Sequence, residues 1–189
     1  MADCWDGVIK PELSQGDLLA LVIVGTADSP LVPLKRGATR KGGGESWDKS
    51  PWTPNSNGIG HFLGRGRQID VIILSQDCEI DKRGGRVPVL VAPVFPISAL
   101  STEADRINVL SRKRYPFLPL PSIEGVLEES YADLRCTTYI YRDLIDTADR
   151  KKSMTSQGVN DLVKQIIAFM THIPFEKIVV PTQGGVDTD

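Results

Sequence analysis

The chain has 189 residues, 22 basic against 24 acidic side chains, 41% hydrophobic and 24% charged residues, the proportions of an ordinary soluble globular protein. A formal net charge of −2 excludes a globally basic nucleic-acid-binding protein and a protein with a polyanionic tail. The three cysteines lie far apart in sequence, which fits neither a disulfide framework nor paired zinc-ligand motifs. The N-terminus is acidic and no apolar stretch is long enough to span a bilayer, so we expect a cytoplasmic protein that is neither exported nor membrane-spanning.

The first half of the chain predicts three strands. The apolar run over residues 17–25 is typical of a buried strand, and a second strand is expected over residues 69–76. A third apolar run covers residues 87–95. The glycine turn before it indicates that the second and third strands form a hairpin.

A long segment separates the first predicted strand from the second. Residues 26–68 hold 8 of the 17 glycines, four prolines, and seven Lys or Arg residues against three acidic residues. Because glycine and proline interrupt regular ladders and the segment has no apolar period, we predict a long basic loop inserted into the domain.

The second half of the chain predicts helices and one further strand. Residues 97–114 have helical spacing, with Ser98 or Ser101 as the candidate N-cap. Two prolines within residues 117–121 exclude a central strand there. Alternation over residues 131–141 predicts a strand, with one side formed by Leu134, Cys136, Thr138 and Ile140.

The clearest helical pattern lies near the C-terminus. Apolar side chains recur at helical spacing, at Val159, Leu162, Val163, Ile166, Ile167 and Met170. We expect this helix to pack its apolar stripe on the sheet. Beyond Pro174 a short apolar run, Ile178-Val179-Val180, precedes a Gly-Gly and Asp-rich tail, which we predict to be frayed.

The predicted order of elements favours an α+β fold. Strands and helices do not alternate as βα units do, which indicates a small, strongly bent antiparallel sheet with a long basic loop and a C-terminal amphipathic helix. We predict one domain over residues 1–189. Its parts are a barrel-like region over 15–96 with the insertion at 26–68, a helix–strand–helix region over 97–173, and the tail over 174–189.

The inserted segment offers candidate binding residues. Cations interleaved with aromatic side chains on a flexible backbone suit single-stranded nucleic acid, through phosphate pairing and base stacking. The same residue types anchor protein interfaces, and a solvated insertion without any ligand explains the pattern equally well. The candidate binding residues are Arg36, Arg40, Lys41, Trp47, Trp52 and His61.

The segment after the second strand places a cysteine among acidic residues. Cys78 is a candidate nucleophile, with His61 or His172 as its candidate base. The neighbouring Asp77 and Glu79 favour the protonated thiol over the thiolate, which supports the alternative of an unreactive structural cysteine.

Motifs for metals and nucleotides are not found in the sequence. The acidic residues around Cys78 lack the calcium-loop spacing, and one cysteine with one or two histidines makes a poor zinc site. No glycine-rich phosphate-binding motif opens a helix. We therefore predict neither a metal nor a cofactor.

Three short motifs mark the predicted strands: Gln15-Gly16-Asp17, Val71-Ile72-Ile73-Leu74-Ser75 and Val89-Leu90-Val91-Ala92-Pro93-Val94. Over residues 15–96 they resemble the MazF/PemK family, which implies an SH3-like barrel. Members of that family that cleave RNA do so without a metal, using an arginine in the loop before the second strand and a hydroxyl residue beyond it. The resemblance therefore implies Arg65 or Arg67 as the catalytic cation, with Ser75 as the hydroxyl group.

Two further segments, residues 75–81 and 129–135, resemble segments of uncharacterised bacterial proteins with similar barrels, and that resemblance implies no established activity. We interpret the chain as an accessory binding module of a bacterial toxin–antitoxin or antiviral-defence system, which binds a protein partner, RNA, or both. One alternative is a metal-independent endoribonuclease that uses Arg65 or Arg67 with Ser75. The other is a cysteine-dependent hydrolase that uses Cys78.

Overall fold

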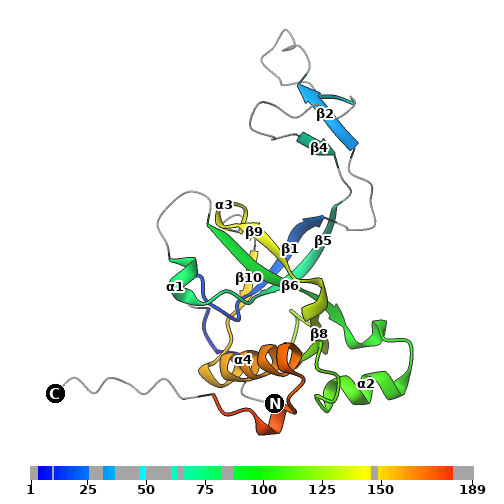
Figure 1. Ribbon diagram of the computed structural model, residues 1–189. Coiled ribbons are helices and arrows are strands. Elements are labelled where there is room, and N and C mark those ends of the chain that lie inside the picture. Colours follow the sequence, from blue (N-terminus) through cyan, green and yellow to red (C-terminus); the bar gives the residue numbers. More distant parts are fainter. Residues whose placement is uncertain are drawn as a thin grey trace, which may run out of the picture. The chain divides into compact units, whose positions relative to one another are not determined.

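Figure 1 shows the computed structural model of the chain, which describes residues 4–9, 11–25, 32–36, 47–49, 61–63, 66–81, 87–145 and 149–180. For residues 21, 23–25, 32–36, 47–49, 61–63, 66, 67, 143 and 144 the description covers the backbone alone. The chain divides into two compact units, formed by residues 1–22 with 69–189 and by residues 23–68.

A strongly curled antiparallel sheet forms a half-barrel in the first unit (Figure 1). Within the described residues its order is β10-β1-β5-β6-β8-β7, and β9 also pairs with β6. The strands are β1 Leu18–Gly25, β5 Gly66–Ile73, β6 Pro88–Pro96, β7 Phe117–Leu120, β8 Ser130–Asp133, β9 Thr138–Tyr141 and β10 Asp149–Lys152. The predicted antiparallel pairing of the second and third strands is confirmed, because Ile72 of β5 lies opposite Ala92 of β6. The helix α1 (Asp77–Ile80) lies between these strands, and the glycines of the predicted turn, Gly84 and Gly85, lie outside the described residues.

The strand β6 pairs with two different strands along its length. Residues 88–91 of β6 pair with β9, and residues 94–96 pair with β8. The 3₁₀ turn η2 (Leu134–Cys136) joins β8 to β9 at this change, so the single strand predicted over residues 131–141 is two strands. Pro93 lies where the ladder is interrupted, so its missing N–H leaves no strand hydrogen bond unmade.

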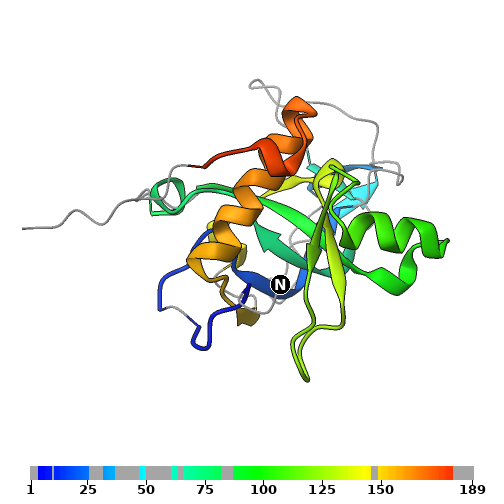
Figure 2. The same ribbon diagram turned by 90° about the horizontal axis from the view of Figure 1, so that it is seen from below.

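The C-terminal helix α4 (Ser156–Thr171) lies across one face of the sheet, as Figures 1 and 2 show. Leu162 is fully buried, and Ile166 packs against the core cluster that contains Ile72 of β5. The prediction that this helix packs on the sheet is therefore confirmed. Met170, the last member of the predicted stripe, is 72% exposed, because the buried face of the helix includes Leu162 of that stripe but is completed by Gln165 and Ala168, which lie outside it.

Residues 97–114 form two short elements where the sequence predicts one helix. They are the 3₁₀ turn η1 (Ile97–Ala99) and α2 (Glu103–Leu110). The Oγ1 of Thr102 accepts the Asp105 N–H at 3.1 Å and caps α2, so neither predicted serine is the cap. Two further one-turn helices, α1 (Asp77–Ile80) and α3 (Arg142–Ile145), follow β5 and β9.

Residues 26–68 are not loop throughout. Their described part contains a three-stranded sheet in the order β3-β2-β4, formed by β2 Val32–Arg36, β3 Trp47–Lys49 and β4 His61–Leu63. Strands this short have no detectable apolar period, and their pairing joins residues far apart in sequence. Residues 174–180 contain the turn η3 (Phe175–Lys177) and the buried Ile178, whereas the Gly-Gly and Asp-rich tail, which the sequence predicts to be frayed, lies outside the described residues.

Candidate binding surface

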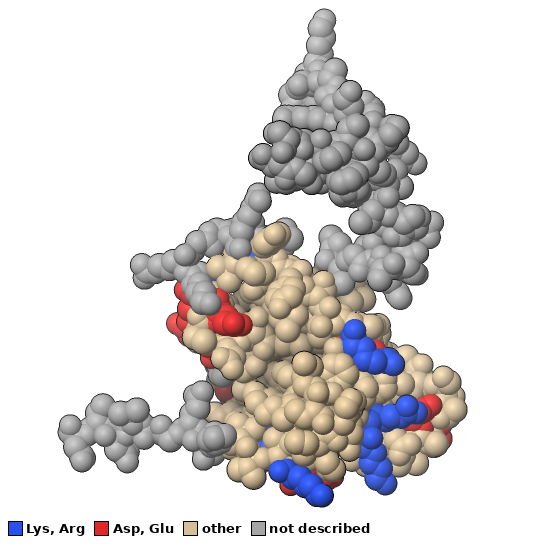
Figure 3. All heavy atoms as spheres, viewed as in Figure 1, with Lys and Arg blue, Asp and Glu red and all other residues tan. Residues whose placement is uncertain are grey.

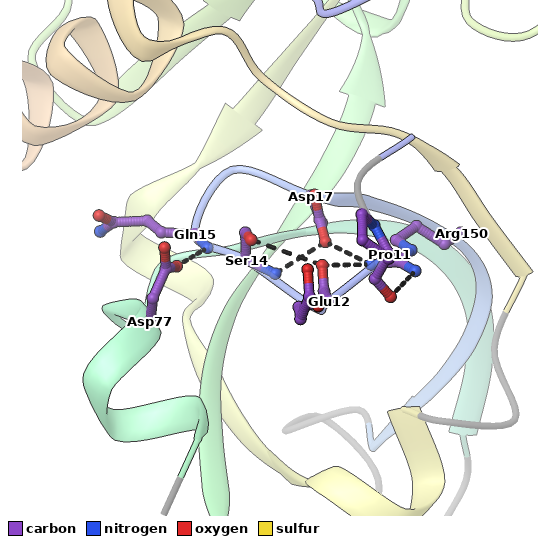
Figure 4. Close-up of polar contacts among 7 residues, drawn as sticks. All are labelled: Pro11, Glu12, Ser14, Gln15, Asp17, Asp77 and Arg150. Atoms are coloured by element: carbon purple, nitrogen blue, oxygen red, sulfur yellow. Dashed lines mark hydrogen bonds and ion pairs between the residues drawn. The ribbon is translucent and has the colours of Figure 1, made fainter. Parts of the chain in front are cut away.

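The first two sequence motifs meet at α1. Asp77 Oδ1 accepts the Gln15 backbone N–H at 2.7 Å, although the two residues are 62 positions apart. The Gln15 side chain donates from Nε2 to the Leu74 carbonyl at 2.7 Å. Figure 4 shows the contact between Asp77 and Gln15 beside the turn that leads into β1. The turn and α1 are thus held together by backbone and side-chain hydrogen bonds.

Asp17 forms a buried clasp in the same turn (Figure 4). Its Oδ2 accepts the Ser14 N–H at 2.8 Å and lies 3.2 Å from Arg150 Nη1 on β10. Arg150 also donates to the carbonyls of Glu12 and Pro11, at 2.6 and 3.0 Å. The guanidinium therefore joins the N-terminal segment and the residue before β1 to β10, which is a structural role.

Ser75, the implied catalytic hydroxyl residue, is 6% exposed. Its Oγ accepts the Leu90 N–H at 2.8 Å, and this bond satisfies a backbone group of β6 that β5 no longer reaches. Arg67 lies near the start of β5, at the opposite end of the strand from Ser75. Arg65 lies outside the described residues.

The helix α1 is held by one buried residue and exposes polar side chains to solvent. Ile80 is fully buried, and its carbonyl accepts Arg142 Nη1 at 2.7 Å, which joins α1 to the end of β9. The exposed side chains of this segment are Gln76, Asp77, Cys78, Glu79 and Asp81. Among the described contacts, Cys78 Sγ reaches Gln76 Oε1 at 3.8 Å and no cation or imidazole.

The other two thiols are held in the protonated form. Burial, followed by the charge of Asp161, raises the pKa of Cys4 to about 11. Burial and Asp133 also raise the pKa of Cys136. Neither thiol is a ready nucleophile, because attack requires the thiolate. His172, a candidate base, packs near Tyr115 with ring centroids 6.3 Å apart.

Two tyrosines stand out on β9, on the other side of β6 from α1. Tyr139 is 68% exposed and Tyr141 is 48% exposed, while Ile140 between them is 7% exposed. Tyr139 is paired with Leu90, and Tyr141 with Pro88. We call these four residues, Pro88, Leu90, Tyr139 and Tyr141, the tyrosine face. The sequence alternation assigns Tyr139 and Tyr141 to the side opposite Ile140, a signal that could have identified them.

Charged side chains of both signs lie on the face of the molecule that Figure 3 shows. Acidic side chains gather over α1 on one side of this view, Lys and Arg side chains gather on the other side, and an uncharged surface lies between them.

The sequence-predicted binding residues fall in residues 23–68. Arg36 of β2 lies opposite Trp47 of β3 in the strand register, and His61 of β4 lies opposite Leu34. The backbone pairing therefore brings one predicted cation beside one predicted aromatic residue. The predicted positions outside the described residues are Arg40, Lys41 and Trp52.

Within residues 129–135, Asp133 and Arg135 form a polar contact that the sequence did not predict. Asp133 is 4% exposed, and its carboxylate accepts three hydrogen bonds from Arg135, at 3.0, 3.0 and 2.7 Å. The Arg135 guanidinium lies 4.6 Å from the centroid of the Phe117 ring. Burial, followed by Asp133, raises the pKa of Tyr131. These contacts fix the start of η2 and so the path of the chain into β9.

The described part of the chain contains a small pocket between Asp70, Phe95 and Glu128. Its volume of about 170 Å³ is well below the roughly 300–1,000 Å³ of typical ligand sites. Among the described residues, no three His, Cys, Asp or Glu side chains are grouped to hold a metal ion. None of the described helices is long and apolar enough to cross a membrane.

Comparison of the chain with protein-family models, with curated proteins and with solved structures finds no match.

Proposed function

We propose that the chain is a binding module for a protein partner and that the tyrosine face is its contact surface. The observation that carries this proposal is the exposure of Tyr139 and Tyr141, 68% and 48%, on a strand whose inward residue is buried. Tyrosine provides a large contact area with few rotatable bonds and a polar hydroxyl group, so it is enriched where proteins bind. Because both rings stand on a strand, binding does not have to order the backbone that carries them.

The described charges beside β9 favour a protein over RNA. The segment at α1, whose Ile80 carbonyl accepts Arg142 Nη1 at the end of β9, exposes three acidic residues, Asp77, Glu79 and Asp81. Single-stranded RNA requires a surplus of cations, because each phosphate contact replaces a condensed counterion. An acidic segment near the tyrosines instead suits a protein, whose own surface charges are mixed.

The candidate nucleophiles support a binding function over catalysis. Ser75 already satisfies a backbone N–H, and the described contacts of Cys78 include no activating group. The resemblance to MazF/PemK-like barrels suggests the setting, so we include in the proposal an accessory role in a bacterial toxin–antitoxin or antiviral-defence system.

Affinity capture with the intact protein tests the proposal. The bait proteins are the wild type, the double variant Tyr139→Ala with Tyr141→Ala, and Met170→Ala as a matched loss of an exposed apolar side chain elsewhere. Bound protein and RNA are both quantified. We expect one protein to be retained by the wild type and by Met170→Ala, and its affinity to fall at least about tenfold in the double variant.

Salt dependence separates the two classes of partner. Affinity for the captured protein should vary weakly with salt, because the proposed contact is mainly uncharged. Binding of single-stranded RNA with a logarithmic salt slope steeper than about −3 would contradict the proposal, as would a partner that the double variant retains fully.

A further inference from the structure

We propose that the partner binds as an extended strand added to the outer edge of β9; this inference rests on the protein-binding function proposed above. The class of ligand is thus a peptide segment in β conformation. The argument comes from the edges of the sheet and from the direction of the backbone groups on β9.

The described sheet ends in three strands, and two of them carry features that prevent pairing. β10 has the sequence Asp-Arg-Lys-Lys, in which every side chain is charged. β7 contains Pro119, which has no N–H to donate. Charged residues, lysine above all, and proline are the devices by which proteins protect exposed edges. β9, with the sequence Thr-Tyr-Ile-Tyr, has neither device.

The register shows which backbone groups of β9 face outward. The Arg142 N–H donates to the Val87 carbonyl at 3.0 Å, so Ile140 and Thr138, two and four positions earlier, also face β6. The N–H and C=O groups of Tyr139 and the N–H of Tyr141 therefore point away from β6, whereas the C=O of Tyr141 accepts the first hydrogen bond of α3 (Arg142–Ile145). Among the described residues, β9 has no second strand on that side.

This edge matches an extended backbone. Its outward groups are the N–H and C=O of Tyr139 and, at strand spacing, the N–H of Tyr141, which an added strand complements by its main chain alone. The tyrosine rings would then lie beside the side chains of the added strand. Because aromatic residues pair best with aromatic or β-branched residues across strands, we expect such residues at alternate positions of the bound segment.

Amide exchange with a defined probe tests the proposal. The probe is a peptide selected from a random phage-displayed library on the intact protein. In the complex, the amides of Tyr139 and Tyr141 should exchange at least about tenfold more slowly, while Ile140, already bonded to β6, should change little. Failure to enrich any peptide, or a selected peptide that leaves the two tyrosine amides unprotected, overturns the proposal.

Two variants separate the backbone contact from the side-chain contact. Tyr139→Pro removes the ring and the outward N–H, whereas Tyr139→Ala removes the ring alone. We expect the proline variant to bind the peptide at least about tenfold more weakly than the alanine variant. Equal affinities overturn strand addition. If the proline variant unfolds, the exchange measurement on the wild-type protein decides.

Other outcomes distinguish the two proposals. If the captured protein requires the tyrosine rings but leaves both amides unprotected, the binding function stands and strand addition fails. If nothing depends on the rings and no amide is protected, both fail. If the free protein sediments as a dimer with both amides already protected, a second copy occupies the edge, which overturns the assignment to a separate partner.

Discussion

Replacement of Gly158 by alanine should destabilise the protein, although alanine is the better helix former. Gly158 lies in the first turn of α4, where an added Cβ would be 2.4 Å from the backbone oxygen of Cys4 and 3.2 Å from Cβ of Met154. Carbon and oxygen atoms cannot approach to 2.4 Å without a shift. Because the neighbour is main chain and not a flexible side chain, residues 4–6 must move.

The loss of stability can be estimated from the hydrogen bonds that hold residues 4–6. The Cys4 carbonyl accepts the Thr155 N–H at 3.0 Å, the Asp6 N–H donates to the Ser153 carbonyl at 2.8 Å, and Trp5 Nε1 donates to the Pro121 carbonyl at 3.0 Å. At about 1 kcal/mol for each hydrogen bond, loss of all three costs about 3 kcal/mol. Helix propensity returns up to about 1 kcal/mol. The expected net loss is about 2 kcal/mol.

Thermal unfolding followed by circular dichroism measures this loss. For a chain of this length, about 2 kcal/mol corresponds to a fall in Tm of about 4–8 °C. Gly7→Ala is the matched control, because an added Cβ there has nothing within 4 Å, and its Tm should stay within about 1–2 °C of the wild type. A Gly158→Ala variant as stable as the wild type would show that residues 4–6 do not pack on α4 as described.

Four further predictions concern the contacts of Asp17, RNA and the thiols. Arg150→Ala leaves the buried Asp17 carboxylate without its cation and should cost about 3 kcal/mol in urea unfolding, whereas Lys151→Ala, which loses an exposed pair, should cost under about 1 kcal/mol; equal effects would refute the clasp. Stoichiometric protein in EDTA should leave single-stranded RNA intact, and cleavage under those conditions would instead support the ribonuclease alternative. The pKa of Cys4 is raised from 9.0 to about 11, so the folded state holds its proton longer and the free energy of unfolding should fall as pH rises from about 9 to 11. Mass spectrometry after iodoacetamide treatment at pH 8 should show Cys78 alkylated faster than Cys4, and the reverse order would contradict the burial of Cys4.

The elements that the sequence predicts correctly are those whose own residues carry the signal. The apolar runs at residues 17–25, 69–76 and 87–95 correspond to β1, β5 and β6, because strands buried on both faces are apolar throughout. The stripe of α4 likewise predicts a helix on the sheet. The face was less well predicted, because Gln165 is fully buried through its hydrogen bond to the Tyr115 carbonyl, a partner 50 residues away.

Short elements depended on partners that no local pattern reveals. β10 is a charged segment that is a strand because β1 offers it a ladder. The interruption of residues 131–141 at η2 follows from the change of partner along β6, and from the contact between Arg135 and Asp133. Pairing of this kind is set by tertiary contacts, which outweigh weak local propensity.

For the candidate binding surface too, the sequence indicated one part and the tertiary structure decided the rest. The sequence by itself placed Tyr139 and Tyr141 on one side of a strand and marked Asp77 and Cys78 as polar residues after a buried strand. Only the tertiary structure decided that β9 is an edge strand, that α1 is tied to Gln15, and that one strand, β6, separates α1 from the tyrosines. The alternation of side chains is a property of the local backbone, whereas the exposure of a strand edge depends on which other strands pair with it.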